Sequence, residues 1–274
     1  PLTYMHTYKC SSCEFGNQSS ILQGVVQSSL FCVIPKHHNY SGVMAARIVV
    51  LFALLAVLCG LCSAQNYCNI KTCRGRPHTA CRFRSALPAS RCTGLQQTGL
   101  TAEEKQKVLN LHNELRQRVA RGQEHRGSPG PQPAATNMAH LTWDNELEKI
   151  AQTWASQCNF AHDTCRDVER FNVGQNIAYG DTTGDISTLD VDRLVKNWYE
   201  EVKDYDHNQV ARFGAVRGNG GKQIGHYTQL VWADTTKLGC GAIKYNDGMF
   251  NKFFLVCNYG PSGNWIGEPV YQTR

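Results

Sequence analysis

The sequence predicts an α+β fold. Patterns of amphipathic helices come first along the chain, and strand patterns joined by a hairpin-type turn come last, as expected when helices cover an antiparallel sheet. Hydrophobic residues make up 42% of the 274 residues and charged residues 18%, which is typical of globular proteins. The thirteen cysteines indicate an oxidising compartment and a fold stabilised by disulfides.

The segment 44–64 has the pattern of a secretory signal peptide. Arg47 follows Met44, an apolar run covers 48–58, and small residues precede a cleavage point after Ala64. This run is much shorter than the ~20 residues that a bilayer crossing requires, so we expect no membrane span. Residues 1–43 precede this methionine, and we interpret them as an upstream leader or a gene-model artefact outside the folded protein.

Removal of residues 1–64 leaves an even number of cysteines. Five of the thirteen are lost, and 13 − 5 = 8 remain, which suits four disulfides. Four of the eight lie within 65–100, a segment without helical or strand periodicity, so we expect an N-terminal extension held by crosslinks. The main domain is expected at 101–274. Spacing alone does not choose among the many pairings that eight cysteines allow.

The net charge of the expected mature chain is small. Without residues 1–64, 25 basic residues face 21 acidic residues, which gives 25 − 21 = +4. We interpret this charge as too small and too evenly spread to predict binding of nucleic acid.

Three helices are predicted. The first begins at Thr101, where Thr101 and Glu104 match a capping box, and ends at Gly122. The second follows Asp144, and the third begins at about Asp190. Apolar side chains recur on one face of each helix: Val108, Leu111, Leu115 and Val119 in the first; Leu147, Ile150, Ala151, Trp154, Ala155 and Cys158 in the second; Val191, Leu194, Val195, Trp198 and Val202 in the third.

Three strands are predicted after the helices. They cover 227–232, 240–245 and 251–259, and the last two are joined across Asn246-Asp247-Gly248, a sequence typical of hairpin turns.

Four polar residues are candidates for a functional site. His162 follows the second helix, Gln175 lies in VGQNIA, Glu201 lies on the third helix, and His226 precedes the first strand. Spacing alone does not show that these side chains converge, and histidines in such positions are more often structural. The motifs of zinc proteases (HExxH), phosphate loops and serine hydrolases (GxSxG) are absent from the sequence.

Two segments, GHYTQLVW at 225–232 and FLVCNYGPSGNW at 254–265, resemble signatures of the CAP superfamily of cysteine-rich secretory, antigen 5 and pathogenesis-related 1 proteins. WYEEVKDY and QCNFAHDTC match as well, and NYCNIKTCRGRPHTACRF is similar to the arthropod venom allergen 5 (antigen 5) branch in particular. The resemblance implies a three-layer α-β-α sandwich with a disulfide-stapled N-terminal extension. It also implies four pairs, Cys68–Cys81, Cys73–Cys165, Cys92–Cys158 and Cys240–Cys257.

In the wider superfamily a cleft carries two histidines and two glutamates, and the histidines can hold a divalent metal. The matching residues here are His162, Gln175, Glu201 and His226, so Gln175 stands where the family pattern has Glu. An amide cannot act as a general base and carries no negative charge toward a cation. We therefore expect weak, pH-sensitive binding of zinc or magnesium at His162 and His226, with Glu201 nearby.

The resemblance favours a secreted, extracellular antigen 5-like protein of venom, saliva or haemolymph that is a non-enzymatic binding scaffold. Expected partners are a lipid, a sterol or a biogenic amine, with host proteins or antibodies as further candidates, and allergenicity follows from the resemblance alone. The alternative is a metal-dependent hydrolase or peptidase that uses His162, Glu201 and His226, which Gln175 disfavours. A channel-directed toxin is less expected, because such relatives have a further cysteine-rich domain and we find no cysteine after Cys257.

Overall fold

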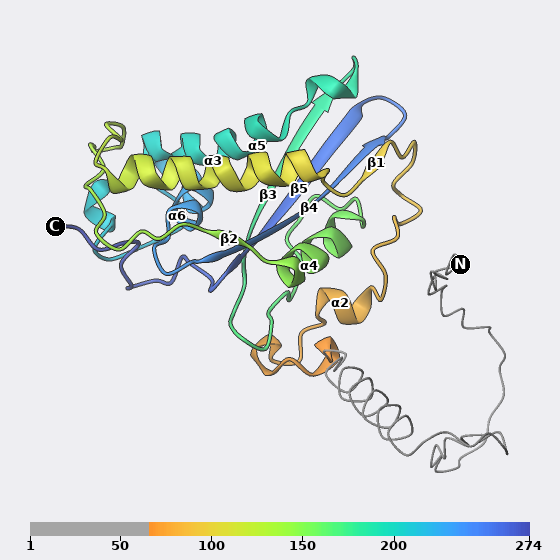
Figure 1. Ribbon diagram of the computed structural model, residues 1–274, viewed down its shortest axis with the longest axis horizontal. Coiled ribbons are helices and arrows are strands. Elements are labelled where there is room, and N and C mark those ends of the chain that lie inside the picture. Colours follow the sequence, from red (N-terminus) through yellow and green to blue (C-terminus); the bar gives the residue numbers. More distant parts are fainter. Residues whose placement is uncertain (1–65) are drawn as a thin grey trace, which may run out of the picture. The chain divides into compact units, whose positions relative to one another are not determined.

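A central β-sheet lies between two layers of helices in the computed structural model, which describes residues 66–274 (Figure 1). This arrangement confirms the α+β fold and the three-layer sandwich. The predicted signal peptide at 44–64 and the upstream segment 1–43 lie outside the described residues. Between residues 66 and 274, the structure has no helix with both the length and the hydropathy that a bilayer crossing needs.

The sheet is built around three long antiparallel strands in the order β4-β5-β3. The short β1 pairs antiparallel with β4, and the short β2 pairs parallel with it. The strands are β1 (Gln97–Thr98), β2 (Thr142–Trp143), β3 (Gly174–Thr182), β4 (Lys237–Asn246) and β5 (Asn251–Gly260). The predicted hairpin is confirmed as β4–β5, whereas sequence analysis missed β3, which includes Gln175.

Helices cover both faces of this sheet. On one face lie α3 (Ala102–Ala120), α5 (Val191–Tyr199) and α6 (Gly225–Leu230), and on the other lies α4 (Asn145–Ala155), with α2 (Thr79–Arg82) against it. Alternation along β5 divides its side chains between two cores. Phe253, Leu255, Cys257 and Tyr259 pack with the first layer, and Phe254 and Val256 pack with α4.

Two glycines allow α4 to lie directly on β4. A Cβ atom at Gly239 would lie 2.2 Å from the backbone N of Glu148, and one at Gly241 would lie 2.2 Å from the backbone N of Gln152. The Gln152 side chain also donates to the Ala242 carbonyl (3.0 Å) and accepts from the Ala242 amide (2.8 Å). Larger side chains at these glycines would force the helix away from the sheet.

The three predicted helices are confirmed, with two differences at their ends. The Thr101–Glu104 capping box is present at the start of α3, and Asp144 and Asp190 cap α4 and α5. Cys158 lies beyond the end of α4, and Val202 lies in the 3-10 turn η4 (Glu200–Asp204) that follows α5.

The predicted strand at 227–232 is wrong, because this segment forms most of helix α6. Its aromatic and β-branched residues favour a strand locally. In the structure, however, residues 227–233 are all buried, so the segment has no solvent face from which periodicity could be recognised.

Four disulfides join Cys68–Cys81, Cys73–Cys165, Cys92–Cys158 and Cys240–Cys257, the same pairs that the resemblance implies. Two of these bonds attach the extension to residues after α4. The Cys240–Cys257 bond joins directly paired residues of β4 and β5. The predicted boundary between the extension, 65–100, and the main domain, 101–274, stays a prediction.

Arg116 of α3 is fully buried, and none of its hydrogen-bond partners is a carboxylate. Its guanidinium instead donates to backbone carbonyls, including those of Leu230 (3.0 Å), Trp232 (2.7 Å) and Ala139 (2.8 Å). Burial lowers its pKa to about 10. The side chain therefore fixes the chain that leaves α6 against α3.

His112 connects α3 to β5 inside the larger core. The ring is fully buried, with Nδ1 2.8 Å from the Val108 carbonyl and Nε2 2.8 Å from the Tyr259 hydroxyl. Burial lowers its pKa to about 4, and the positive charge of Arg116 adds to this effect. The folded protein therefore keeps His112 neutral well below pH 6.5.

The His112 environment predicts acid sensitivity. Below pH 6.5 the unfolded chain binds a proton at His112 and the folded protein does not, so stability falls between pH 6.5 and 4 by about 3 kcal/mol from this group. Urea unfolding at pH 7 and pH 4 should show a smaller loss for His112→Gln than for wild type. Equal losses in the two proteins would contradict this assignment.

Candidate functional site

His162 and Gln175 form one hydrogen-bonded pair. His162 lies in the loop after α4, close in sequence to the disulfide of Cys165, and Gln175 lies near the start of β3. The His162 Nδ1–H donates to the Gln175 side-chain oxygen over 2.8 Å. This bond leaves the Nε2 atom of His162 as the unprotonated ring nitrogen when the imidazole is neutral.

The amide of Gln175 also donates to two oxygens that a glutamate could not satisfy. Its Nε2 lies 3.2 Å from an Asp163 carboxylate oxygen and 3.1 Å from the Asn258 side-chain oxygen. Asp163 is buried and also accepts from Arg166 and Thr79. Gln175 therefore matches its surroundings, because a carboxylate at this position would face the carboxylate of Asp163.

Glu201 and His226 form the second pair. The His226 Nδ1–H donates to Glu201 Oε1 over 2.7 Å. The other oxygen, Oε2, accepts from the backbone amides of His226 (2.9 Å) and Tyr227 (3.1 Å), in the first turn of α6. The side chains of His226 and Glu201 are only 18% and 14% exposed. Both Glu201 oxygens are thus occupied by donors, and His226 Nε2 is the unprotonated ring nitrogen of neutral His226.

The two pairs lie near each other. Asn176, which follows Gln175 on β3, donates to the backbone carbonyl of His226 over 3.0 Å. The charge of His226 also lowers the pKa of His162. The four predicted residues therefore form two hydrogen-bonded pairs connected through Asn176, an arrangement that spacing alone could not show.

The pKa of His162 is lowered below 6.5. Loss of solvation by surrounding protein atoms is the main cause, and the positive charges of Arg166 and His226 act in the same direction. These effects outweigh the hydrogen bond to Gln175, which raises the pKa. His162 is therefore neutral at pH 7, which is the form that can bind a metal.

Sequence reasoning missed the polar residues that support the site. Asp163 and Asn258 orient Gln175, and Asn176 connects β3 to His226. Trp198 was predicted as core, and its buried ring also stacks on His226 with a centroid separation of 6.1 Å. Asp163 and Asn176, which are adjacent in sequence to His162 and Gln175, offered a local signal.

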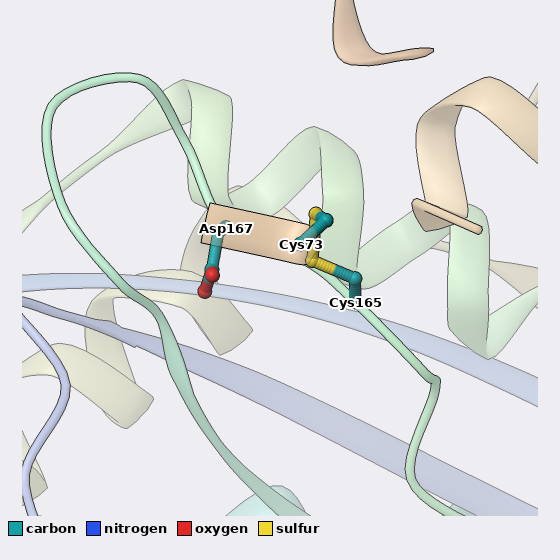
Figure 2. Close-up of side chains that lie close together, drawn as sticks. All are labelled: Cys73, Cys165 and Asp167. Atoms are coloured by element: carbon teal, nitrogen blue, oxygen red, sulfur yellow. A yellow bond between two sulfur atoms is a disulfide. The ribbon is translucent and has the colours of Figure 1, made fainter. Parts of the chain in front are cut away.

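Another group of side chains could be mistaken for a metal site. Among residues 66–274, a single group of three or more His, Cys, Asp or Glu side chains has all its possible ligand atoms within 4.8 Å of one another. This group is Cys73, Cys165 and Asp167 (Figure 2). The two sulfurs are joined in a disulfide and offer no thiolate. Asp167 accepts from the Val173 amide (2.8 Å) and from Asn172 (2.9 Å). This group is structural.

Comparisons with known proteins identify similar sequences. The model of the cysteine-rich secretory protein family, CAP, matches residues 109–259. Venom allergen 5 of Vespula pensylvanica is 51% identical over 210 residues, which cover 77% of this chain and 100% of that protein. A venom allergen 3 homolog of Dinoponera quadriceps is 50% identical over 214 residues, which cover 77% of this chain and 91% of that protein.

Solved structures with the same architecture also match. Na-ASP-1 is 31% identical with a TM-score of 0.56, and the match covers 68% of this chain and 45% of that chain. NaASP2, crystallised with Zn²⁺, is 33% identical with a TM-score of 0.54, and the match covers 66% of this chain and 91% of that chain.

The hydrogen bonds of Glu201 predict that it contributes more to stability than its neighbour Glu200. Glu201→Gln removes the charge and places amide hydrogens against donors, which should cost about 1–3 kcal/mol. Glu200 is 54% exposed and pairs with Arg126, so Glu200→Gln should cost less than about 1 kcal/mol. Urea unfolding of the two matched variants compares these costs. If they are equal, Glu201 does not hold α6.

Proposed function

The chain belongs to the cysteine-rich secretory protein (CAP) family, and we propose that it is a secreted, non-enzymatic binding protein of the venom allergen 5 type. The venom allergens that cover most of the described residues support the venom type. Secretion is supported by the four disulfides, which persist in oxidising compartments.

The non-enzymatic proposal rests on Glu201 and Gln175, the two side chains that accept hydrogen bonds from the histidine rings. Glu201 accepts three hydrogen bonds, and Gln175 is a neutral amide. A general base needs an oxygen or nitrogen that can take a proton from the substrate or from water. Neither residue is arranged for this role, so a hydrolase or peptidase would depend on the histidine nitrogens alone as bases, and this alternative receives less support.

We further propose that the Nε2 atoms of His162 and His226 hold a zinc ion weakly. Each ring donates its Nδ1–H to a neighbouring side chain, as metal-binding histidines do. Two imidazole nitrogens favour zinc over magnesium, which prefers oxygen ligands. A bound zinc ion would supply Lewis acidity. The related NaASP2 has been crystallised with Zn²⁺, which supports the choice of metal.

Small hydrophobic or amine ligands remain expectations of the family resemblance. The apolar faces of α3 and α5, where a lipid or sterol could be sought, pack into the larger core. The proposal for the site itself is therefore limited to the metal.

Zinc titration calorimetry at pH 7.5 tests the histidine pair. Wild type should release or absorb heat on saturable binding, and the double variant His162→Ala, His226→Ala should not. The control is His125→Ala, His140→Ala, which removes two exposed imidazoles elsewhere and should bind zinc like wild type. Loss of binding in the control, or its retention in the site variant, would contradict the proposal.

Gln175→Glu should change stability and zinc affinity in opposite directions. Without metal, the new carboxylate faces Asp163 and loses the two amide donations, which should destabilise the protein by about 1–3 kcal/mol. A carboxylate partner for His162 should tighten zinc binding by about 10- to 100-fold. Melting temperatures with and without zinc measure both effects. A Gln175→Glu protein with unchanged zinc affinity would separate Gln175 from the metal site.

A further inference from the structure

Positive charge is concentrated in the N-terminal extension, contrary to the even spread expected from the sequence. Between residues 66 and 100 there are six basic residues and no acidic residue, whereas 101–274 have 19 basic and 21 acidic residues. The extension therefore carries +6 and the rest of the described chain 19 − 21 = −2. The net charge of +4 conceals this separation. The basic residues are Lys71, Arg74, Arg76, Arg82, Arg84 and Arg91.

All six side chains are exposed, and none takes part in an ion pair among the described residues. Arg76 donates to the Cys73 carbonyl (3.1 Å), and Arg82 lies over the Phe83 ring (5.2 Å). These contacts leave the charge of both residues uncompensated. The extension thus carries five guanidinium groups and one ammonium group that have no carboxylate partner among the described residues.

Crosslinks hold these charges in place. The Cys68–Cys81 bond closes a loop within the extension, and the Cys73–Cys165 and Cys92–Cys158 bonds attach it to the loop that follows α4. Its backbone also donates to the main domain, from Ala89 to the Ser156 carbonyl over 2.8 Å. Cations on a crosslinked backbone lose less conformational entropy on binding than cations on a free tail.

A hollow of about 250 Å³ lies between the extension and α4, and its lining also favours an anion. Arg84 and Lys149 contribute positive charge and Ser85 contributes a hydroxyl group, whereas the hydroxyl of the buried Thr153 donates to the Lys149 carbonyl over 2.8 Å. No acidic residue is among its lining residues, which are completed by Tyr67, Ala80, Phe83 and Ala86.

The acidic residues of α4 do not cancel this charge. Glu146 pairs with Arg170 (2.7 Å), and Glu148 pairs with Lys105 (2.5 Å). Glu169 is exposed and lines a different hollow, together with Lys71. Lys149 is exposed and has no ion-pair partner among the described residues.

We infer that the basic extension, together with Lys149, binds a sulfated polysaccharide. Guanidinium groups match the geometry of sulfate oxygens through paired hydrogen bonds. The exposed Ser85 hydroxyl at the hollow can bond to a sugar hydroxyl, and a flexible polyanion can contact several cations in turn. An anionic membrane fits less well, because the large apolar side chains exposed between 66 and 100 are Leu87 and Leu95, and no aromatic anchor is exposed there.

The test measures binding of the purified, disulfide-bonded protein to heparin at increasing NaCl concentration. The variant Arg82→Gln, Arg84→Gln, Arg91→Gln removes three charges of the extension. The matched control Arg193→Gln, Arg212→Gln, Lys222→Gln removes three exposed charges of the main domain that make no ion pair. Circular dichroism and the mass of the unreduced proteins establish that all three proteins are folded and crosslinked.

Wild type and control should bind heparin equally and elute at the same NaCl concentration. The extension variant should bind about 10- to 100-fold more weakly at 0.15 M NaCl, because about three fewer counterions are released. Equal weakening in both variants, or none in either, would overturn the inference.

Three further probes test the kind of polyanion. Desulfated heparin, a 30-base-pair DNA duplex and phosphatidylserine vesicles should all bind more weakly than heparin. If any of the three binds as tightly, the assignment to sulfated sugar is wrong. Because these measurements do not involve zinc or the histidines, they can fail without affecting the proposed function.

Discussion

The short helix α6 is held at each end by a charged side chain from another helical segment. At its N-terminus, where the helix dipole is positive, the Glu201 carboxylate accepts the amides of His226 and Tyr227. At its C-terminus, where the dipole is negative, Arg116 donates to the carbonyls of Leu230 and Trp232. Six residues of helix would be marginal in isolation. These two contacts place His226, and the site depends on that placement.

The two histidines of the candidate site are likewise held by polar side chains from other parts of the chain. Glu201 fixes the His226 ring while it caps α6, and Gln175 fixes the His162 ring while its amide satisfies Asp163 and Asn258. One residue of each pair is therefore committed to structure. The site therefore has two available imidazole nitrogens but no free carboxylate beside them, and a glutamine is compatible with its position.

Sequence patterns predicted most of the helices and strands. For the candidate site, sequence analysis named four residues but did not predict how they pair. The caps at Thr101 and Asp144 and the Asn246–Gly248 turn are local interactions, so their residues show them directly. Helix α6 was predicted as a strand because its aromatic and β-branched residues favour a strand locally, whereas the contacts that hold the helix come from Glu201 and Arg116, which are distant in sequence. Strand β3 was missed, and the pairing of His162 with Gln175 could not be seen, because both depend on the register of β3 against β5. The four disulfide pairs came from family resemblance, since spacing left the pairing open.

The central claim is that His162 and His226 both carry their proton on Nδ1 and leave Nε2 free. A long-range proton–nitrogen correlation spectrum of ¹⁵N-labelled protein at pH 7.5, with His162→Ala and His226→Ala for assignment, reports this directly. The account predicts that both neutral rings are protonated at Nδ1 and that zinc shifts the Nε2 resonances of both. Rings protonated at Nε2, or a zinc shift confined to Nδ1, would contradict it.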